Sequence, residues 1–321
     1  MEIKMNVIAA AFAFEEDYGN SPQLTGRSDE QKIRVYMRNI VVSLISAHRM
    51  NPDDRTVLVT NADIPGEYRK ELEDGGVEIE RIEFDSFRMP KKFIWSLAFF
   101  KLCALEYLLN NDEYEKILLV DSDTYTVKDF KELWKEADKG ILLYNVCHSI
   151  EHPERVKIIE DYRKLYPEED ENIVHYGGEF ICGRKENISR YIEECREVYK
   201  RICASDYDVQ DNIGDETLTA IAAAHLKRQA LIIEAGAYVT RYWTEERFYL
   251  VSTNTVYNPV CVWHLPGEKD KGMLIMYDYY IKHKVFPELK KSLKIYGLAD
   301  GKRPYFFDSM YAKWVRRNAK K

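Results

Sequence analysis

The sequence predicts an α/β protein with a doubly wound, mostly parallel sheet flanked by helices. Apolar strand-like runs alternate with segments of helical periodicity through the first half of the chain. One run, residues 117–120, is fully apolar and leads directly into two aspartates, as expected at the carboxyl edge of a parallel sheet. With 321 residues, 45% of them hydrophobic, the chain can bury a sizeable core.

The first half is expected to supply most of the sheet. Ser28 opens a helix, because Gln31 stands at the capping-box position and apolar residues then recur at helical spacing. The other helices are expected at 68–73, ending at Gly75 and Gly76, and at 93–109. Strands are expected at 7–14, 56–60, 77–84 and 116–120.

The second half is less regular. In this half we expect strands at 179–182, 230–234 and 260–264, and helices at 191–202 and 215–226. No internal repeat and no low-complexity linker divides it from the first half. We therefore expect one catalytic domain over residues 1–272 and a helical, basic tail over 273–321.

Charge and cysteine usage limit the class of protein. The formal net charge of −7 and a pI near 5.7 give no sign of a nucleic-acid binder. The apolar stretch near the N-terminus lacks a basic region and a cleavage site, so it is expected to be the first strand. The six cysteines show no C-x-x-C pair and are expected to be reduced, buried thiols of a cytoplasmic protein, which makes zinc unexpected.

A hard-oxygen site is predicted where the strand at 116–120 ends. Asp121 and Asp123 follow the strand, with hydroxyls from Ser122 and Thr124 beside them. Such a set suits Mg²⁺ or Mn²⁺ carrying a diphosphate. The alternative is a solvated turn, because Asp and Ser are common turn residues.

Several segments, taken in order, carry a family resemblance. They are FFKLCALEYL, KILLVDSDTYTVKDFKELW, HYGGEFICG, DETL at 215–218 and VWHLPGEKDKG. Together they resemble the glycogenin-like family of retaining glycosyltransferases, which includes bacterial galactosyl- and glucosyltransferases of surface glycans. The resemblance spans roughly residues 5–272 and implies a single GT-A fold, with a nucleotide-sugar-binding N-terminal half and an acceptor-side C-terminal half.

The resemblance also implies a donor site. Asp121, Asp123 and His264 would hold Mn²⁺ or Mg²⁺, and the diphosphate would lie against positive and small residues. Those residues are Lys101, Ser122, Gly267 and Lys269, beside the aspartates. Two alternatives stay open: His264 as a hydrogen-bonded core residue, and Lys101 as a lysine that only extends to solvent.

Three departures from the family pattern leave the phosphate contacts and the acceptor open. The family's lysine after the late glycine falls on Asp270, between Lys269 and Lys271. The glutamine of its D-Q pair is Glu216 here. The asparagine of its acceptor strand falls at Gly177, in a run that continues through Gly178 to Glu179.

Glu179, Asp215 and Glu216 are the candidate catalytic carboxylates, each placed to contact a sugar hydroxyl or the reacting carbon. For Asp215 and Glu216 the alternative is that they cap a helix and complement its dipole from the first turn. Tyr242 and Trp243 are candidate acceptor-side aromatics, whereas Asp206, Asp208 and Asp211 are expected to form a solvated loop.

The predicted function is metal-dependent transfer of a hexose from a UDP-sugar to a glycan or lipid-linked acceptor, with retention. One alternative is a haloacid-dehalogenase-like phosphatase, which also places D-x-D after a strand. Its motif usually follows the first strand, whereas this one lies more than a hundred residues into the chain. The other alternative is a nonenzymatic glycan-binding module.

The C-terminal end has its own prediction. Residues 313–321 carry five basic residues and no acid, beside Trp314. A short basic, aromatic helix can rest on an anionic surface, so peripheral contact with the inner membrane face is expected. The alternative is a solvated, frayed terminus.

Overall fold

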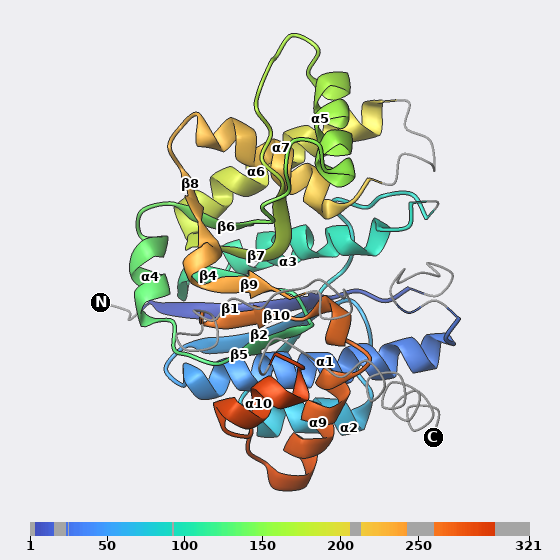
Figure 1. Cartoon of the computed structure of the whole chain (residues 1–321), viewed down its shortest axis with the longest axis vertical. Coiled ribbons are helices and arrows are strands. Elements are labelled where there is room, and N and C mark those ends of the chain that lie inside the picture. The colour runs from blue at the N-terminus through green and yellow to red at the C-terminus, as the bar shows by residue number, and fades with distance from the viewer. Residues whose placement is uncertain are drawn as a thin grey trace.

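A computed structural model describes residues 4–15, 24, 26–91, 93–205, 213–242 and 260–298. A large central sheet carries helices on both faces, and a small second sheet lies beside it (Figure 1). The fold class predicted from the sequence is confirmed.

Seven strands form the large sheet, in the order β3-β2-β1-β4-β7-β6-β8. β7 is antiparallel to both of its neighbours, and the remaining pairings are parallel, so β7 runs against the other six strands. The strands are β1 (Met5–Phe12), β2 (Arg55–Thr60), β3 (Glu78–Arg81), β4 (Tyr114–Val120), β6 (Ile141–Asn145), β7 (Tyr176–Arg184) and β8 (Ile232–Glu234).

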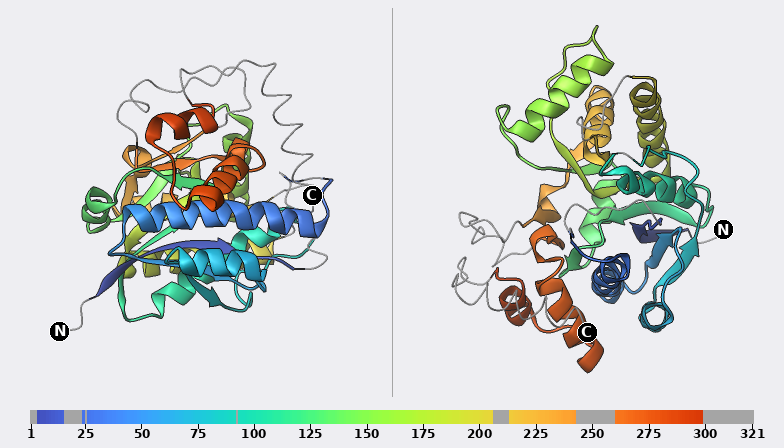
Figure 2. Two further views of the ribbon diagram at one scale, coloured as in Figure 1. Left: turned by 90° about the horizontal axis from the view of Figure 1, so that it is seen from below. Right: turned by 90° about the vertical axis from the view of Figure 1, so that its right-hand side faces the viewer.

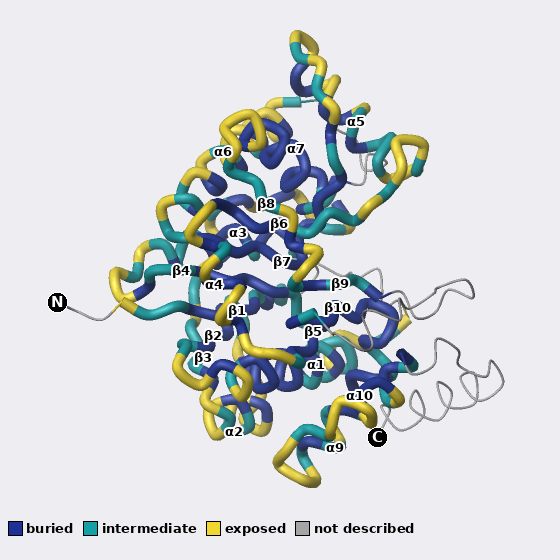
Figure 3. The backbone as a smooth tube through the Cα atoms, turned by 60° about the vertical axis from the view of Figure 1, so that its left-hand side comes forward, coloured by how far each residue is buried: buried dark blue, intermediate teal, exposed yellow. Residues whose placement is uncertain are grey.

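Alternate residues of the central strands face different helices. Along β1, Val7 and Ala9 belong to the core that packs against α3, α6 and α7, whereas Ala10 packs with α1 and α2 on the other face. Figure 2 shows these two helical layers. Both faces of the central strands are therefore covered, and Figure 3 colours most of their residues as buried. The helices are α1 (Asp29–Met50), α2 (Gly66–Asp74), α3 (Phe100–Leu109), α4 (Lys131–Ala137), α5 (Pro153–Leu165), α6 (Lys185–Ala204) and α7 (Asp215–Lys227).

The small sheet brings late residues to the end of β4. Its strands β5 (Thr124–Thr126), β10 (Val262–His264) and β9 (Val239–Arg241) lie in the order β5-β10-β9. His264 pairs with Thr124, and the amide of Leu265 donates a hydrogen bond to the carbonyl of Asp123 at 2.9 Å. Trp263, fully buried, anchors this sheet in a separate cluster of apolar side chains.

Helices α9 (Gly272–His283) and α10 (Leu289–Ile295) lie beside α1 and the small sheet. Met273 and Met276 of α9 join the cluster around Trp263. The expected division into residues 1–272 and 273–321 stays a prediction, and the basic end from Lys313 lies outside the described residues. No helix in the described ranges combines the length and apolar character that a membrane crossing requires.

Most predicted elements are present, and the errors lie at the boundaries. The capping box of α1 is confirmed: the Gln31 amide donates to Ser28 Oγ at 3.3 Å, and the Ser28 amide donates to Gln31 Oε1 at 3.2 Å. The helix predicted to begin at residue 93 begins at Phe100, after a 3₁₀ turn at Ser96–Phe99, because apolar periodicity does not distinguish α from 3₁₀ winding. The strand predicted at 77–84 is limited to the short edge strand β3.

The cysteine prediction is correct in part. All six are free; Cys103, Cys182, Cys195 and Cys261 are buried. The expectation of burial is wrong for the other two, since Cys147 lies in the exposed loop after β6 and Cys203 near the exposed end of α6.

Candidate active site

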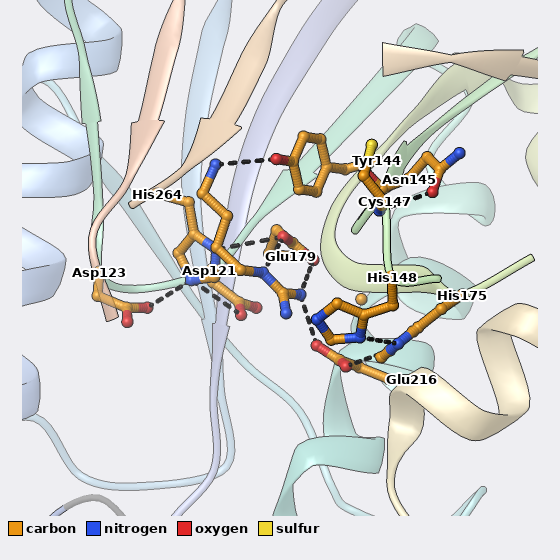
Figure 4. Close-up of polar contacts among 12 residues, drawn as sticks. Asp121, Asp123, Tyr144, Asn145, Cys147, His148, His175, Glu179, Glu216 and His264 are labelled. Atoms are coloured by element: carbon orange, nitrogen blue, oxygen red, sulfur yellow. Dashed lines mark hydrogen bonds and ion pairs between the residues drawn. The ribbon is translucent and has the colours of Figure 1, made fainter. Parts of the chain in front are cut away.

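Asp121, Asp123 and His264 meet at the edge of the sheet where β4 ends. Nε2 of His264 lies 3.8 Å from Asp121 Oδ2 and 3.6 Å from Asp123 Oδ1 (Figure 4). One ligand atom from each residue lies within 4.8 Å of the others. Two carboxylates and an imidazole fit a divalent cation, and the nitrogen donor favours Mn²⁺ over Mg²⁺.

The imidazole of His264 is oriented from behind by Glu179. Nδ1 of His264 lies 3.3 Å from Glu179 Oε1, on the side away from the aspartates. Burial disfavours the protonated imidazole, but Asp123 and Glu179 outweigh it and raise the pKa of His264 to about 9. The contact of Nδ1 with Glu179 holds the ring so that Nε2 of His264 points toward Asp121 and Asp123.

The loop after β10 places Lys269, and not Asp270, at the site. Lys269 Nζ lies 3.2 Å from Asp123 Oδ2, whereas Asp270 is paired with Arg27 at 2.7 Å. Burial of Asp123 raises its pKa, but Lys269 and His264 outweigh it and hold that pKa well below the usual range. Gly267 is buried in the 3₁₀ turn that precedes Lys269.

Lys101 of α3 connects the two aspartate segments. Its Nζ lies 2.9 Å from Asp121 Oδ1 and 2.6 Å from Asp215 Oδ2, and it donates a hydrogen bond to the Gly178 carbonyl at 3.0 Å. The alternative in which Lys101 only extends to solvent is wrong, because it is buried in this ion-pair network. Burial of the Asp215 carboxyl raises its pKa by more than the neighbouring Lys101 lowers it, so the pKa lies above its usual value.

The other side of the site is held together by Arg241, at the end of β9. Its guanidinium binds both oxygens of Glu179 at 2.6 Å and Glu216 Oε1 at 2.6 Å. Glu216 Oε2 also lies 2.8 Å from His175 Nε2. Burial raises the pKa of Glu216, but Arg241 and His175 outweigh it and lower that pKa to about 2.

Sequence reasoning missed Arg241, because no motif marks a lone arginine in a short strand. A signal was present nonetheless. Glu179 and Glu216 both depart from the family pattern by adding a negative charge, and two such carboxylates at one site require a cation.

The two glycines before Glu179 leave room for these ion pairs. A Cβ at Gly177 would overlap the Glu179 carboxylate and the Arg241 guanidinium, and a Cβ at Gly178 would overlap Asp215 Oδ2. The space that a side chain at position 177 would take is therefore filled by the Glu179–Arg241 pair.

Neither carboxylate at the start of α7 serves as its cap. The N-cap residue is Gly214, which makes no side-chain capping hydrogen bond. The Asp215 and Glu216 side chains turn to Lys101 and Arg241 instead, although both acids still stand in the first turn.

The remaining predicted residues are placed as follows. Ser122 is half-buried between the two aspartates. Tyr242 does not face an acceptor, because it is 1% exposed and packs edge-on against Trp263. Trp243 and the aspartates at 206, 208 and 211 lie outside the described residues.

The model of the glycosyl transferase family 8 matches residues 10–180, more than half of the chain. This span includes Asp121, Asp123 and Glu179 and ends before Asp215. No curated protein sequence matches the chain.

The fold is similar to that of the bifunctional glycosyltransferase WbbM in its apo structure, with a TM-score of 0.54 and 12% identity over 93% of this chain. The chain spans about half of that protein, 52%. Two further matches are the galactosyltransferase LgtC in complex with donor and acceptor sugar analogues (TM-score 0.49, 14% identity, covering 94% of this chain and 99% of LgtC) and mouse xyloside xylosyltransferase 1 in its apo form (0.47, 12%, covering 82% and 97%).

Proposed function

We propose that this chain, which belongs to glycosyl transferase family 8, is a glycosyltransferase that transfers a hexose from a UDP-sugar to a glycan or lipid-linked acceptor, with retention. The observation that carries the proposal is the convergence of Asp121, Asp123 and His264 at the carboxyl end of β4. Open α/β sheets bind ligands at that edge.

The three ligand residues would hold Mn²⁺, which when bound supplies a Lewis acid for the charge that grows on the departing diphosphate. Glu179 acts as a positioning residue. By accepting the Nδ1 proton of His264 it fixes the ring, and Nε2 would release its own proton when the ion binds. Lys101 and Lys269 supply fixed positive charge beside the aspartates, where the phosphates would lie.

The three carboxylates differ in their access to a sugar. The side chain of Glu179 is 0% exposed and that of Asp215 is 10% exposed, whereas that of Glu216 is 36% exposed. We assign to Glu216 the contact with the donor sugar near the reacting carbon, and to Asp215 a contact that depends on Lys101. Glu179, grouped with them from the sequence, is then a positioning residue.

Nucleotide binding tests the proposal. UDP should raise the melting temperature only when Mn²⁺ is present, because a ligand that binds the folded state stabilises it by mass action. Asp123→Asn should abolish this shift, whereas Asp63→Asn, at an exposed aspartate paired with Arg81, should retain it. Equal UDP binding in EDTA and in Mn²⁺ would overturn the proposal.

Transfer is tested with UDP-glucose and UDP-galactose. Slow donor hydrolysis is expected without an acceptor. Glu216→Gln should lower kcat more than it raises KM, since its contact is proposed to strengthen in the transition state. A wild-type kcat in this variant would return Glu216 to a structural role.

Family membership sets aside the phosphatase and the nonenzymatic module. Contact of the basic end with an anionic membrane remains a proposal. Co-sedimentation with anionic vesicles tests it: truncation after Asp308 should remove binding and leave UDP binding unchanged.

A further inference from the structure

A second group of metal-ligating side chains lies beside the glycosyl-transfer site. His148 and His152 lie in the loop between β6 and α5, and Glu154 is in the first turn of α5. One ligand atom of each lies within 4.8 Å of the others. The proposed glycosyl transfer uses none of them.

The spacing within this group is close to that of a coordination site. Nδ1 of His148 lies 3.4 Å from Glu154 Oε2 and 3.0 Å from Nδ1 of His175. Two ligands bound at 2.0–2.1 Å to one tetrahedral ion lie roughly 3.3 Å apart. The separation of His148 from Glu154 is therefore close to the one that an ion needs, whereas His152 lies within 4.8 Å of both.

His152 supplies a second, independent observation. Its Nδ1 is buried and has no hydrogen-bond partner among the described residues. A buried nitrogen without a partner is costly, and a bound ion would satisfy it. The rings of His148 and His152 are stacked with centroids 3.5 Å apart, so coordination requires the His152 ring to tilt out of the stack.

His175 connects this group to the glycosyl-transfer site. One ring nitrogen faces His148 Nδ1, and the other lies 2.8 Å from Glu216 Oε2 (Figure 4). An ion bound at His148 Nδ1 would replace the hydrogen bond to His175, because a metal-bound nitrogen has neither a proton nor a lone pair left to share. His175 Nδ1, 3.0 Å away, would then face the ion as well, while Glu216 accepts the proton on its Nε2, the usual outer partner of a ligating imidazole.

We propose that His148, His152 and Glu154 bind a second metal ion, of the Zn²⁺ class, and that His175 couples this ion to Glu216. Imidazole nitrogen and a single carboxylate suit Zn²⁺, whereas the oxygen-rich aspartate site suits Mn²⁺ or Mg²⁺. The cysteine spacing that made zinc unexpected does not bear on a site built from histidines.

Zn²⁺ titration of the full chain in competition with a chromophoric chelator tests the site. The reference protein carries Asp123→Asn, so that the first site does not take up the probe. We expect one Zn²⁺ per chain in this reference. His152→Gln or Glu154→Gln should weaken its binding by at least about a hundredfold, because even outer partners of a ligand are worth roughly 10–100-fold.

The matched control is His283→Gln, which removes an exposed histidine on α9 and should leave Zn²⁺ affinity unchanged. A second measurement uses His152→Gln in the wild-type background, where the variant should keep Mn²⁺-dependent UDP binding. Zn²⁺ can also occupy the first site of that protein, so the expected change there is from two bound Zn²⁺ per chain to one. Because the Zn²⁺ titrations are independent of transfer and of UDP, they stand if the donor assignment fails.

Equal Zn²⁺ affinity in the reference, His152→Gln and Glu154→Gln proteins would overturn the site and identify the binding as adventitious. The coupling has its own test. His175→Gln should weaken Zn²⁺ by about 10–100-fold, and Glu216→Gln should weaken it by a smaller factor. If neither changes the affinity, the coupling to Glu216 is wrong.

Discussion

The two sides of the candidate site balance their charges differently. On the side of Asp121 and Asp123, called the metal side for the ion proposed there, His264 and Lys269 lie 3.2–3.8 Å from the carboxylate oxygens, and Lys101 pairs with Asp121 at 2.9 Å. On the opposite side, Arg241 binds its two glutamates at 2.6 Å. The longer distances from His264 and Lys269 leave room for a ligand between the charged groups. The close pairing at Arg241 neutralises the two glutamates within the chain. The side of Asp121 and Asp123 is therefore arranged to bind and release a ligand, whereas the side of Arg241 is held in place by its own ion pairs.

The largest effect that distinguishes the two sides is expected at Arg241. Arg241→Met leaves Glu179 buried without its guanidinium, and breaking such a pair costs about 3–5 kcal/mol. Urea unfolding measures the loss. The control is Lys135→Met, which breaks an exposed pair with Glu132 and should change stability by less than about 1 kcal/mol. Equal stability of the two variants would remove the distinction between the two sides.

A smaller effect is expected at the glycines that admit the ion pairs. Gly178→Ala places a methyl group against Asp215 Oδ2, and overpacking of this kind costs about 1–3 kcal/mol. Gly236→Ala is the control, because a Cβ there meets no atom within 4 Å. If both variants melt at the wild-type temperature, the close approach of β7 and α7 is not a constraint.

On the metal side, the third prediction concerns ligand affinity more than stability. Lys269→Met should weaken Mn²⁺-dependent UDP binding by about tenfold, roughly the value of one hydrogen bond to a charged group. Isothermal titration measures it. Lys271→Met, at the other flanking lysine, should bind UDP as the wild type does. A larger loss in Lys271→Met would show that the wrong lysine was assigned to the diphosphate.

The smallest effect is the pH dependence contributed by Glu216. Its pKa of about 2 in the folded protein lies below the unfolded value of about 4.3, so its contribution to stability is present above that value and lost as pH falls towards 2. Because its side chain is 36% exposed, the contribution is small. The difference in unfolding free energy between wild type and Glu216→Gln should shrink from pH 7 to pH 3. A difference that stays constant would show that Glu216 is not held ionised by Arg241 and His175.

Sequence reasoning found the features that depend on neighbouring residues. The capping box of α1 and the apolar run before Asp121 are local patterns, and the structure confirms both elements. The pairing of Arg241 with Glu179 crosses 62 positions and depends on how β9 packs beside β7. With three residues, β9 is too short to show any periodicity.

Sequence reasoning named Lys269 for the phosphates, but it could not give the reason why Asp270 turns away. This orientation depends on a 3₁₀ turn and on Arg27, which lies 243 positions away and pairs with Asp270. An aligned motif gives the order of residues in this loop but not the direction in which each side chain leaves the backbone.

The pairing of His264 with Thr124 has a consequence for how the chain folds while it is being synthesised. During synthesis, β1 to β4 leave the ribosome well over a hundred residues before β10, and such distant partners join late in folding. A nascent chain can therefore build four parallel strands and both aspartates before it can assemble the metal triad. A chain interrupted before Val262 lacks His264, the third of the proposed ligands, so under the proposed function partly made copies could not activate a donor sugar.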